Sequence, residues 1–548
     1  MSENVGHSAA MTTAQGSSRT KKLALAAMLF AVAMTFIDQT IVAIASPNIQ
    51  SELSLTHAGS QWVVNAYLLA LAAAFALGGR LADVIGPRRM VYIGIVGFAA
   101  ASALCGATPK GSLAQSWIII FRVLQGVSGA IMVPAALAIV VAIFPIRERG
   151  RALAVFFGVS GALTSVGPIA GGYLTQWTWR AIFWINIPIA VIALVLTAMA
   201  RIPVTRQRAR IDVPGAVLTA VGMGLSVLGF EQAPSWGWRN VGTWACIVVG
   251  LLVLAAFVRF EARTESPLIQ VRIFRDRAFV IDNAVLLFSM IAFVPVFFFA
   301  AVYSQVSLGY NASKAGLYLL VFFAGFAPAA QIGGRMLDIR GAKRPMVLGC
   351  ALSTVGFALW ASHLNHLSLG AQWIYIVMAG AGIGLLLGPA STDAVNRSFG
   401  TSYGEVTGIT QTVRNYGSSL GIAVLGTLLS TVLANRLNTS LGALGLHRPE
   451  IDSIVHAAGS ATPGTGGAAA PPALQAKISE AISHGFASAT AGVLYGMAVA
   501  LAVAFLVALR HPGGRPGLEE GAEGDKERAA DLREQDAPVT GVDPRPAV

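Results

Sequence analysis

The chain has 548 residues, of which 55% are hydrophobic and only 12% are charged, and its mean hydropathy is +0.67. Soluble proteins carry about 25% charged residues, and disordered chains combine low hydrophobicity with high charge, so both classes are excluded. The net charge of +12 comes from short basic clusters between long apolar runs, which is typical of a membrane protein and not of a nucleic-acid-binding one.

Fourteen apolar runs are long enough to cross the ~30 Å hydrocarbon core of a bilayer as helices, which takes about 20 residues each. In chain order they occupy residues 23–45, 61–81, 90–107, 116–143, 151–174, 181–200, 213–230, 242–260, 279–303, 314–334, 345–362, 371–396, 404–434 and 486–509. The short alternating segments of a membrane β-barrel are absent. The sequence therefore predicts an all-α integral membrane protein with fourteen transmembrane helices.

Lysine and arginine residues predict the orientation, because they accumulate on the cytoplasmic side. With the N-terminus inside, 29 of them fall on cytoplasmic segments and 7 on outer ones, while Arg122 and Arg414 lie within spans. We therefore expect a multi-pass protein of the bacterial cytoplasmic membrane with both termini in the cytoplasm. Residues 1–22 and 510–548 are expected to be disordered, and residues 435–485 to form a long outer loop.

An internal repeat organises the chain. GGRLADVIGPRR at 78–89 recurs as GGRMLDIRGAKR at 333–344. Gly79, Asp83, Gly86 and Arg89 of the first copy each recur 255 positions later. The repeat predicts two homologous six-helix bundles, residues 23–200 and 279–509, with residues 201–278 as a linker that carries two inserted helices. Paired bundles around a midplane site are an architecture of transporters.

Several motifs carry a family resemblance. They are Asp38-Gln39-Thr40 in the first span, Gly79-Arg80-Leu81-Ala82-Asp83 with Gly86 in the following loop, Arg122 with Gly126 in the fourth span, and Gly167-Pro168-Ile169-Ala170-Gly171-Gly172 in the fifth. With these motifs the sequence resembles the major facilitator superfamily and, more narrowly, its fourteen-helix drug–proton antiporter branch. Val84 and Pro87 depart from the loop signature, where basic residues are usual. The resemblance implies two pseudo-symmetric six-helix bundles plus two inserted helices, and the last motif implies an exporter.

Asp38 and Arg122 are charged residues at similar depths in oppositely directed spans. A carboxylate inside a membrane is costly and is a functional candidate by default. We predict that Asp38 carries the proton and that Arg122 tunes it. The alternative is a structural ion pair with no role in transport.

Two further groups have roles that the resemblance implies. The repeated loops would form a conformational latch between the bundles, through Gly79, Asp83, Gly86, Arg88, Arg89 and Asp338. The alternative is a tight, solvated turn. The antiporter motif would form a hinge and seal, through Gly167, Pro168, Gly171 and Gly172, and its alternative is ordinary close packing of helices.

Four residues are candidates to line a substrate cavity: Gln61, Asn65, Tyr67 and Arg414. The sequence offers Asp282, Asp393 or Glu405 as partners of Arg414 without choosing among them. Asp393 could instead pair with Arg397, one helical turn further on.

No GxxxxGK[ST] motif is found, which disfavours an ATP-driven pump, and no motif predicts a cofactor, a metal site or an enzyme. We therefore predict a proton-coupled antiporter that exports amphipathic drugs or toxic compounds by alternating access. The alternative is a dedicated exporter of one metabolite, such as an antibiotic or a siderophore, and a membrane sensor with the same fold is the rival from another class. The expected partners are a lipophilic or cationic small molecule, protons and the lipid bilayer, without nucleic acid, and the chain is expected to be monomeric.

Overall fold

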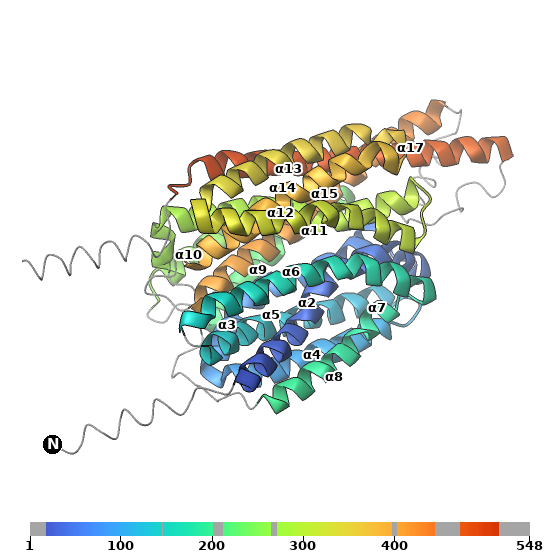
Figure 1. Cartoon of the computed structure of the whole chain (residues 1–548). Coiled ribbons are helices and arrows are strands. Elements are labelled where there is room, and N and C mark those ends of the chain that lie inside the picture. The colour runs from blue at the N-terminus through green and yellow to red at the C-terminus, as the bar shows by residue number, and fades with distance from the viewer. Residues whose placement is uncertain are drawn as a thin grey trace, which may run out of the picture.

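The structure is a computed structural model that describes residues 18–144, 146–200, 212–264, 271–396, 403–443 and 472–513. All regular elements in these residues are helices, and they supply thirteen segments that are long and apolar enough to cross a bilayer. A helix covers each of the fourteen predicted spans, and that of 181–200 is split into two consecutive pieces. The all-α membrane fold that the sequence predicts is therefore confirmed (Figure 1).

The helices form two bundles that lie against one another in Figure 1. The N-terminal bundle consists of α2 (Ser18–Leu53), α3 (His57–Ile85), α4 (Pro87–Gly106), α5 (Ala114–Ile143), α6 (Ile146–Trp177), α7 (Ala181–Trp184) and α8 (Asn186–Met199). The C-terminal bundle consists of α11 (Arg277–Val306), α12 (Ala312–Arg340), α13 (Lys343–His363), α14 (Leu369–Asn396), α15 (Tyr403–Ala443) and α17 (Pro472–Leu509), with 3-10 turns at Val271–Arg275 and Leu364–His366. The inserted helices are α9 (Val213–Trp236) and α10 (Val241–Glu261), and α9 packs against both α3 and α15.

Local sequence explains where the helices begin and turn. Thr56 caps α3 and Asn311 caps α12, since each side chain accepts a hydrogen bond from the backbone N–H three residues further on. The chain reverses after α3 and after α12 at Gly86 (φ 105°) and Gly341 (φ 73°), a conformation that glycine adopts without strain. We call the end of the molecule with these two glycines the basic end, and the end with Thr56 and Asn311 the opposite end.

The repeat in the sequence is also a repeat in the packing. Gly78 of α3 touches the backbone at Ala130 of α5, and Gly333 of α12 touches the backbone at Leu385 of α14. Both pairs are related by the same offset of 255 residues that relates the loop motifs. Small residues allow helices to approach closely where lipid supplies no hydrophobic driving force. The two bundles are thus built on one plan.

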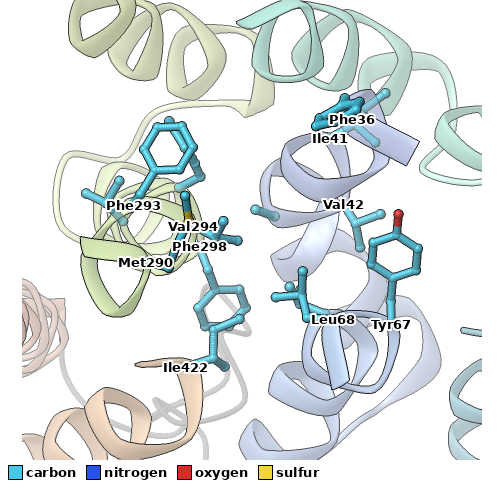
Figure 2. Close-up of a cluster of buried hydrophobic side chains, with 14 of the residues drawn as sticks. Phe36, Ile41, Val42, Tyr67, Leu68, Met290, Phe293, Val294, Phe298 and Ile422 are labelled. Carbon is cyan, nitrogen blue, oxygen red and sulfur yellow. The ribbon is translucent and has the colours of Figure 1, made fainter. Parts of the chain in front are cut away.

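The buried apolar core is continuous across the two bundles. Figure 2 shows Phe36 and Val42 of α2 on one side and Met290, Phe293 and Phe298 of α11 on the other. These side chains are all at least nine-tenths buried. The inner faces of the bundles are therefore in contact, and any movement of one bundle against the other has to separate this core.

The helices extend further than hydropathy predicts. Helix α2 begins at Ser18, inside the segment 1–22 that was expected to be disordered, and α15 and α17 take up both ends of the expected loop 435–485. Residues 510–513 follow α17 in a defined position, with His511 fully buried, although the sequence predicts a disordered tail from 510. The length of an apolar run reflects the thickness of the bilayer. A helix can continue beyond that run into polar residues that have good helix propensity, so it is longer than hydropathy predicts. The remainder of these three segments lies outside the described residues.

Candidate functional site

Asp38 of α2 and Arg122 of α5 form an ion pair inside the N-terminal bundle. The Arg122 Nη1 atom lies 2.5 Å from the Asp38 Oδ2 atom, and both side chains are completely buried. The two residues are 84 positions apart in the sequence and meet because the two helices cross in contact. The structure therefore joins the two charges that the sequence places at one depth.

Gln125, one turn after Arg122, extends the pair into a network. Its side-chain oxygen accepts a hydrogen bond from Arg122 at 2.7 Å, and its amide donates to Asp38 Oδ1 at 3.0 Å and to Ser102 Oγ of α4 at 3.2 Å. Asn186 of α8 donates to the same Ser102 Oγ at 2.9 Å. Four helices of the N-terminal bundle thus meet at one charged centre. No pattern in the sequence points to Ser102 or Asn186 as members of it.

Tyr67 of α3 covers the guanidinium group of Arg122. The Arg122 Cζ atom lies 4.4 Å from the centre of the Tyr67 ring, and Arg122 Nε donates to the Val63 carbonyl at 2.7 Å. The Tyr67 hydroxyl donates to the carbonyl of Thr35 at 3.1 Å. Tyr67 therefore supports the ion pair from a fifth helix and connects it to the segment of α2 that contains Thr35.

This arrangement can hold one exchangeable proton. A buried carboxylate is stable either as a partner of a cation or in its neutral, protonated form. Protonation of Asp38 removes its attraction to Arg122 and leaves the guanidinium group with the Gln125 oxygen and the Val63 carbonyl as acceptors. A change of protonation at this centre therefore alters the contacts between helices, which is what coupling to transport requires.

A small cavity lies between the two bundles. It is lined by α2, α3, α5, α11 and α15 through Thr35, Phe36, Gln39, Leu71, Phe75, Val133, Met290, Phe293, Val294, Gln411, Arg414, Asn415 and Ser418. Its volume is about 20 Å³, room for about one water molecule. The bundles are thus closed around it, and a drug-sized molecule can enter only if they separate.

Of the four predicted cavity residues, only Arg414 lines this cavity. Tyr67 lies at the ion pair, and Gln61 is buried against Gly426 of α15. Asn65 donates a hydrogen bond to Glu231 of α9 at 2.8 Å. These three residues therefore serve contacts between helices: Gln61 and Asn65, one turn apart, face α15 and α9, whereas Tyr67 points from another face of α3 into the N-terminal bundle.

Asn65 is the centre of a polar contact that joins three parts of the molecule. Besides its bond to Glu231, it accepts a hydrogen bond from Ser419 of α15 at 2.5 Å. Ser226 of α9 lies 2.9 Å from the Tyr416 hydroxyl, and Thr427 of α15 donates to the Phe230 carbonyl at 2.6 Å. The inserted helix α9 is thereby tied to both bundles at once.

The antiporter motif on α6 lies at close contacts of α6 with α2 and with α12. Gly167 and Gly171 face α2, and a side chain at either position would collide with Thr40 or Ile41. Gly172 faces Ala312 of α12, in the other bundle, and its carbonyl accepts a hydrogen bond from Ser313 at 3.0 Å. Pro168 is buried in the same contact, against Gly316. The motif therefore seals the bundles together at the opposite end, and its role during transport stays a prediction.

The loop residues lie at the basic end. Gly86 provides the turn, Asp83 is half-buried within reach of the Arg80 charge, and Arg88 lies 6.0 Å from the Tyr92 ring. Gly79 is half-buried, and Arg89 and Asp338 are exposed. Among the described residues, no hydrogen bond or ion pair joins Asp83 to the C-terminal bundle. The latch between bundles therefore also stays a prediction.

The structure reveals a buried acid–histidine cluster that the sequence analysis missed. His511 Nε2 lies 3.3 Å from Asp282 Oδ1 of α11 and 3.3 Å from Asp393 Oδ2 of α14, and the three side chains are almost completely buried. Burial opposes a charge on His511, but the two carboxylates outweigh it and raise the pKa of His511 to about 9. The backbone N–H of Gly513 donates to Nδ1 at 3.1 Å when the ring is neutral.

This cluster contains two of the three acids that the sequence offers as partners of Arg414. Asp282 and Asp393 contact His511 and not Arg414. Arg397, the other partner considered for Asp393, lies outside the described residues, as does the side chain of Glu405. A histidine directly after the last apolar run, with acids near two other helix ends at the same side, is the signal that could have indicated the cluster.

Two packed helical bundles with a charged centre in one and a cavity between them define a membrane transporter. Residues 28–422 match the sequence profile of the Major Facilitator Superfamily, and the chain belongs to this family. It is 34% identical over 412 residues to the tetracenomycin C resistance and export protein of Streptomyces glaucescens, with 74% of this chain and 76% of the relative covered.

Other relatives are of the same kind. The chain is 31% identical over 426 residues to the multidrug resistance protein Stp of Mycobacterium tuberculosis, covering 77% of this chain and 78% of Stp. It is 33% identical over 416 residues to the puromycin resistance protein pur8 of Streptomyces alboniger, covering 74% and 81%. The relatives are thus drug- and antibiotic-resistance proteins, which confirms the resemblance on the sequence.

Solved structures share the fold. A bacterial homologue of the human lysosomal transporter Spinster, inward-facing and occupied, has a TM-score of 0.60 with 16% identity, covering 92% of this chain and 99% of that one. A D-xylose–proton symporter has a TM-score of 0.54 with 13% identity, covering 75% and 90%. At this identity the likeness concerns the fold alone.

Proposed function

We propose that this protein is a proton-coupled antiporter that exports amphipathic drugs or toxic compounds across the bacterial cytoplasmic membrane by alternating access. The observation that carries the proposal is the completely buried Asp38–Arg122 pair. A charged carboxylate in this position is costly unless it has a use or a partner, and its one cationic partner lies on another helix. Protonation and deprotonation of Asp38 change the contacts of α2, the helix that also lines the central cavity through Thr35 and Gln39.

The proposed cycle has two half-steps. When the cavity opens to the outside, substrate leaves and Asp38 takes up a proton. The bundles then rock about the cavity, and when it opens to the cytoplasm Asp38 releases the proton and new substrate binds. A proton that enters down a gradient of ~100 mV contributes about 2.3 kcal/mol to export.

Export in place of import is supported by the antiporter motif and by the relatives. Gly167, Gly171 and Gly172 allow the tight seal at the opposite end that prevents protons from leaking during exchange. The relatives described above are resistance proteins for drugs or antibiotics. The alternative is a dedicated exporter of one metabolite, and the similarity to a tetracenomycin C resistance and export protein supports it. Both alternatives propose that drug-like molecules are carried out of the cell.

The test is dye efflux from liposomes that contain the purified full-length chain, with an imposed pH gradient. Dye efflux by the wild-type protein should stop when a protonophore collapses the proton gradient. The D38N variant should fold, but its dye efflux should no longer depend on the proton gradient. E480Q, which removes an exposed acid at the start of α17, is the matched control and should behave as wild type. Normal proton-driven efflux by a folded D38N variant would overturn the proposal.

A further inference from the structure

The central cavity has a cation on its wall, and no acid of the described residues forms an ion pair with it. Arg414 of α15 lies half-buried on its wall, and its Nε atom is completely buried without a hydrogen-bond partner. Among the described residues, Arg414 makes no ion pair with a carboxylate. The other buried acids that could serve it are engaged elsewhere: Asp38 with Arg122, Glu231 with Asn65, and Asp282 and Asp393 with His511.

An arginine in such a place is unusual because the guanidinium group keeps its charge in proteins and does not escape burial by losing a proton. A buried charge is normally paired or bound to a ligand. The described cavity wall contains no aspartate or glutamate that could supply the missing negative charge. The ligand is then the remaining source of it.

The other wall residues describe the rest of the ligand. Phe36, Phe75 and Phe293 provide flat apolar surfaces, while Gln411 and Asn415 provide amides on the same face of α15 as Arg414. An aromatic body fits the phenylalanine side, and an anionic oxygen group fits the fork of N–H donors that Arg414 presents.

We propose that the exported substrates are aromatic compounds with an anionic oxygen group, a carboxylate or a phenolate, which Arg414 binds in the central cavity. This inference rests on the proposed function as an exporter and names its substrate class. It replaces the lipophilic or cationic substrate that the sequence predicts, because a cation would meet the like charge of Arg414 in a cavity without an acid.

The charge of the substrate changes the electrical balance of the cycle. Exchange of one entering proton for one leaving cation moves no net charge across the membrane. Exchange of one entering proton for one leaving anion moves two positive charges inward. A membrane potential that is negative inside therefore drives anion export twice, through the proton and through the substrate.

The test uses two dyes with the same ring system and opposite charge, fluorescein (anionic) and rhodamine 123 (cationic). Their binding to the purified full-length chain is measured without any gradient, for wild type, R414Q, R414K and R436Q. Arg436 lies on the same helix, is exposed and is outside the cavity, so R436Q is the matched control. Arg414 has no partner to lose among the described residues, and we expect R414Q to fold.

We expect wild type and R436Q to prefer fluorescein, R414Q to bind it roughly tenfold or more weakly, and R414K to recover part of the loss. Rhodamine 123 should bind R414Q at least as well as it binds wild type. In liposomes, fluorescein efflux should speed up when a potassium diffusion potential makes the interior negative.

Three results would overturn the inference: equal binding of fluorescein by wild type and R414Q, a preference of wild type for rhodamine 123, or binding of neither dye. Failure of this inference is separable from failure of the proposed function. Binding is measured without a gradient, whereas the function requires that efflux of some substrate depends on the proton gradient and on Asp38.

Discussion

The two bundles share a packing plan but differ in where they place their charges. The N-terminal bundle keeps an ion pair, Asp38 with Arg122, in its interior. The C-terminal bundle has Phe293 at the position 255 residues after Asp38, stacked on Phe326, and it has two acids, Asp282 and Asp393, at the basic end beside His511. The repeat conserves the glycine contacts that hold helices together, so the duplication fixed the scaffold while the chemistry of each half diverged.

This difference suggests a division of labour between the bundles. The N-terminal half holds the group that we propose to exchange protons. The C-terminal half contributes Arg414 to the cavity, a cation that makes no ion pair within the described part of the chain. Each half therefore has one arginine within a helix, and the two differ in their surroundings: Arg122 is buried beside an acid, whereas Arg414 is half-buried on the cavity wall. The following predictions test this contrast, starting with the largest expected effect.

Removal of Arg122 and removal of Arg414 should affect stability differently. R122A leaves Asp38 buried without its cation and should lower the free energy of unfolding by about 3–5 kcal/mol. R414Q removes a cation that has no carboxylate partner among the described residues and should cause no loss. Thermal unfolding of both variants in detergent measures the difference. Equal losses would mean that the two arginines play the same structural part.

The glycine contacts test where the halves are alike. G78A and G333A each place a methyl group against the backbone of the next helix, so each should lower stability by about 1–3 kcal/mol. G334A is the matched control, because a Cβ atom there meets nothing within 4 Å. Thermal unfolding of the three variants is the measurement. A large loss in one bundle only would contradict the shared plan.

The acid–histidine cluster predicts a pH dependence for the C-terminal bundle. The pKa of His511 is about 9 in the folded chain, above the ~6.5 of a free histidine. The contribution of protonated His511 to the stability of the folded chain is therefore complete below pH ~6.5 and is lost as the pH rises through about 9. We expect on the order of 2 kcal/mol, as for a charge-assisted hydrogen bond.

H511A should lose this stability at pH 6 and differ little from wild type above pH 9. H366A removes a histidine that lies outside the cluster and is the control. The measurement is the unfolding temperature of each variant from pH 6 to pH 10. A constant difference in unfolding temperature between H511A and wild type over that range would exclude protonation of His511 as the cause of the stabilisation.

The smallest expected effect concerns the direct polar contact between the bundles. Asn65 and Ser419 share a hydrogen bond across the interface, and a double-mutant cycle of N65A and S419A should give a coupling of about 1 kcal/mol. The pair S226A and S419A, whose side chains have other partners, should be additive. Absence of coupling between Asn65 and Ser419 would mean that the contact does not contribute to closure.

The sequence by itself determined the fold, because composition and run length leave a helical membrane protein as the solution and a 12-residue repeat reveals the duplication. It also selected Asp38 and Arg122, since charges inside apolar runs stand out on inspection. These are properties of single helices, and hydropathy reports them directly.

Only the tertiary structure determined which side chains meet between helices. The partners of Asp282 and Asp393, the contact of Asn65 with Glu231, and the isolation of Arg414 depend on how helices far apart in the chain are rotated against one another. Apolar periodicity is weak in a membrane because lipid and protein core are equally apolar, so the sequence does not record which face of a helix points inward. For that reason the sequence supplied Arg414 with three candidate partners, and the structure places two of them, Asp282 and Asp393, beside His511 instead.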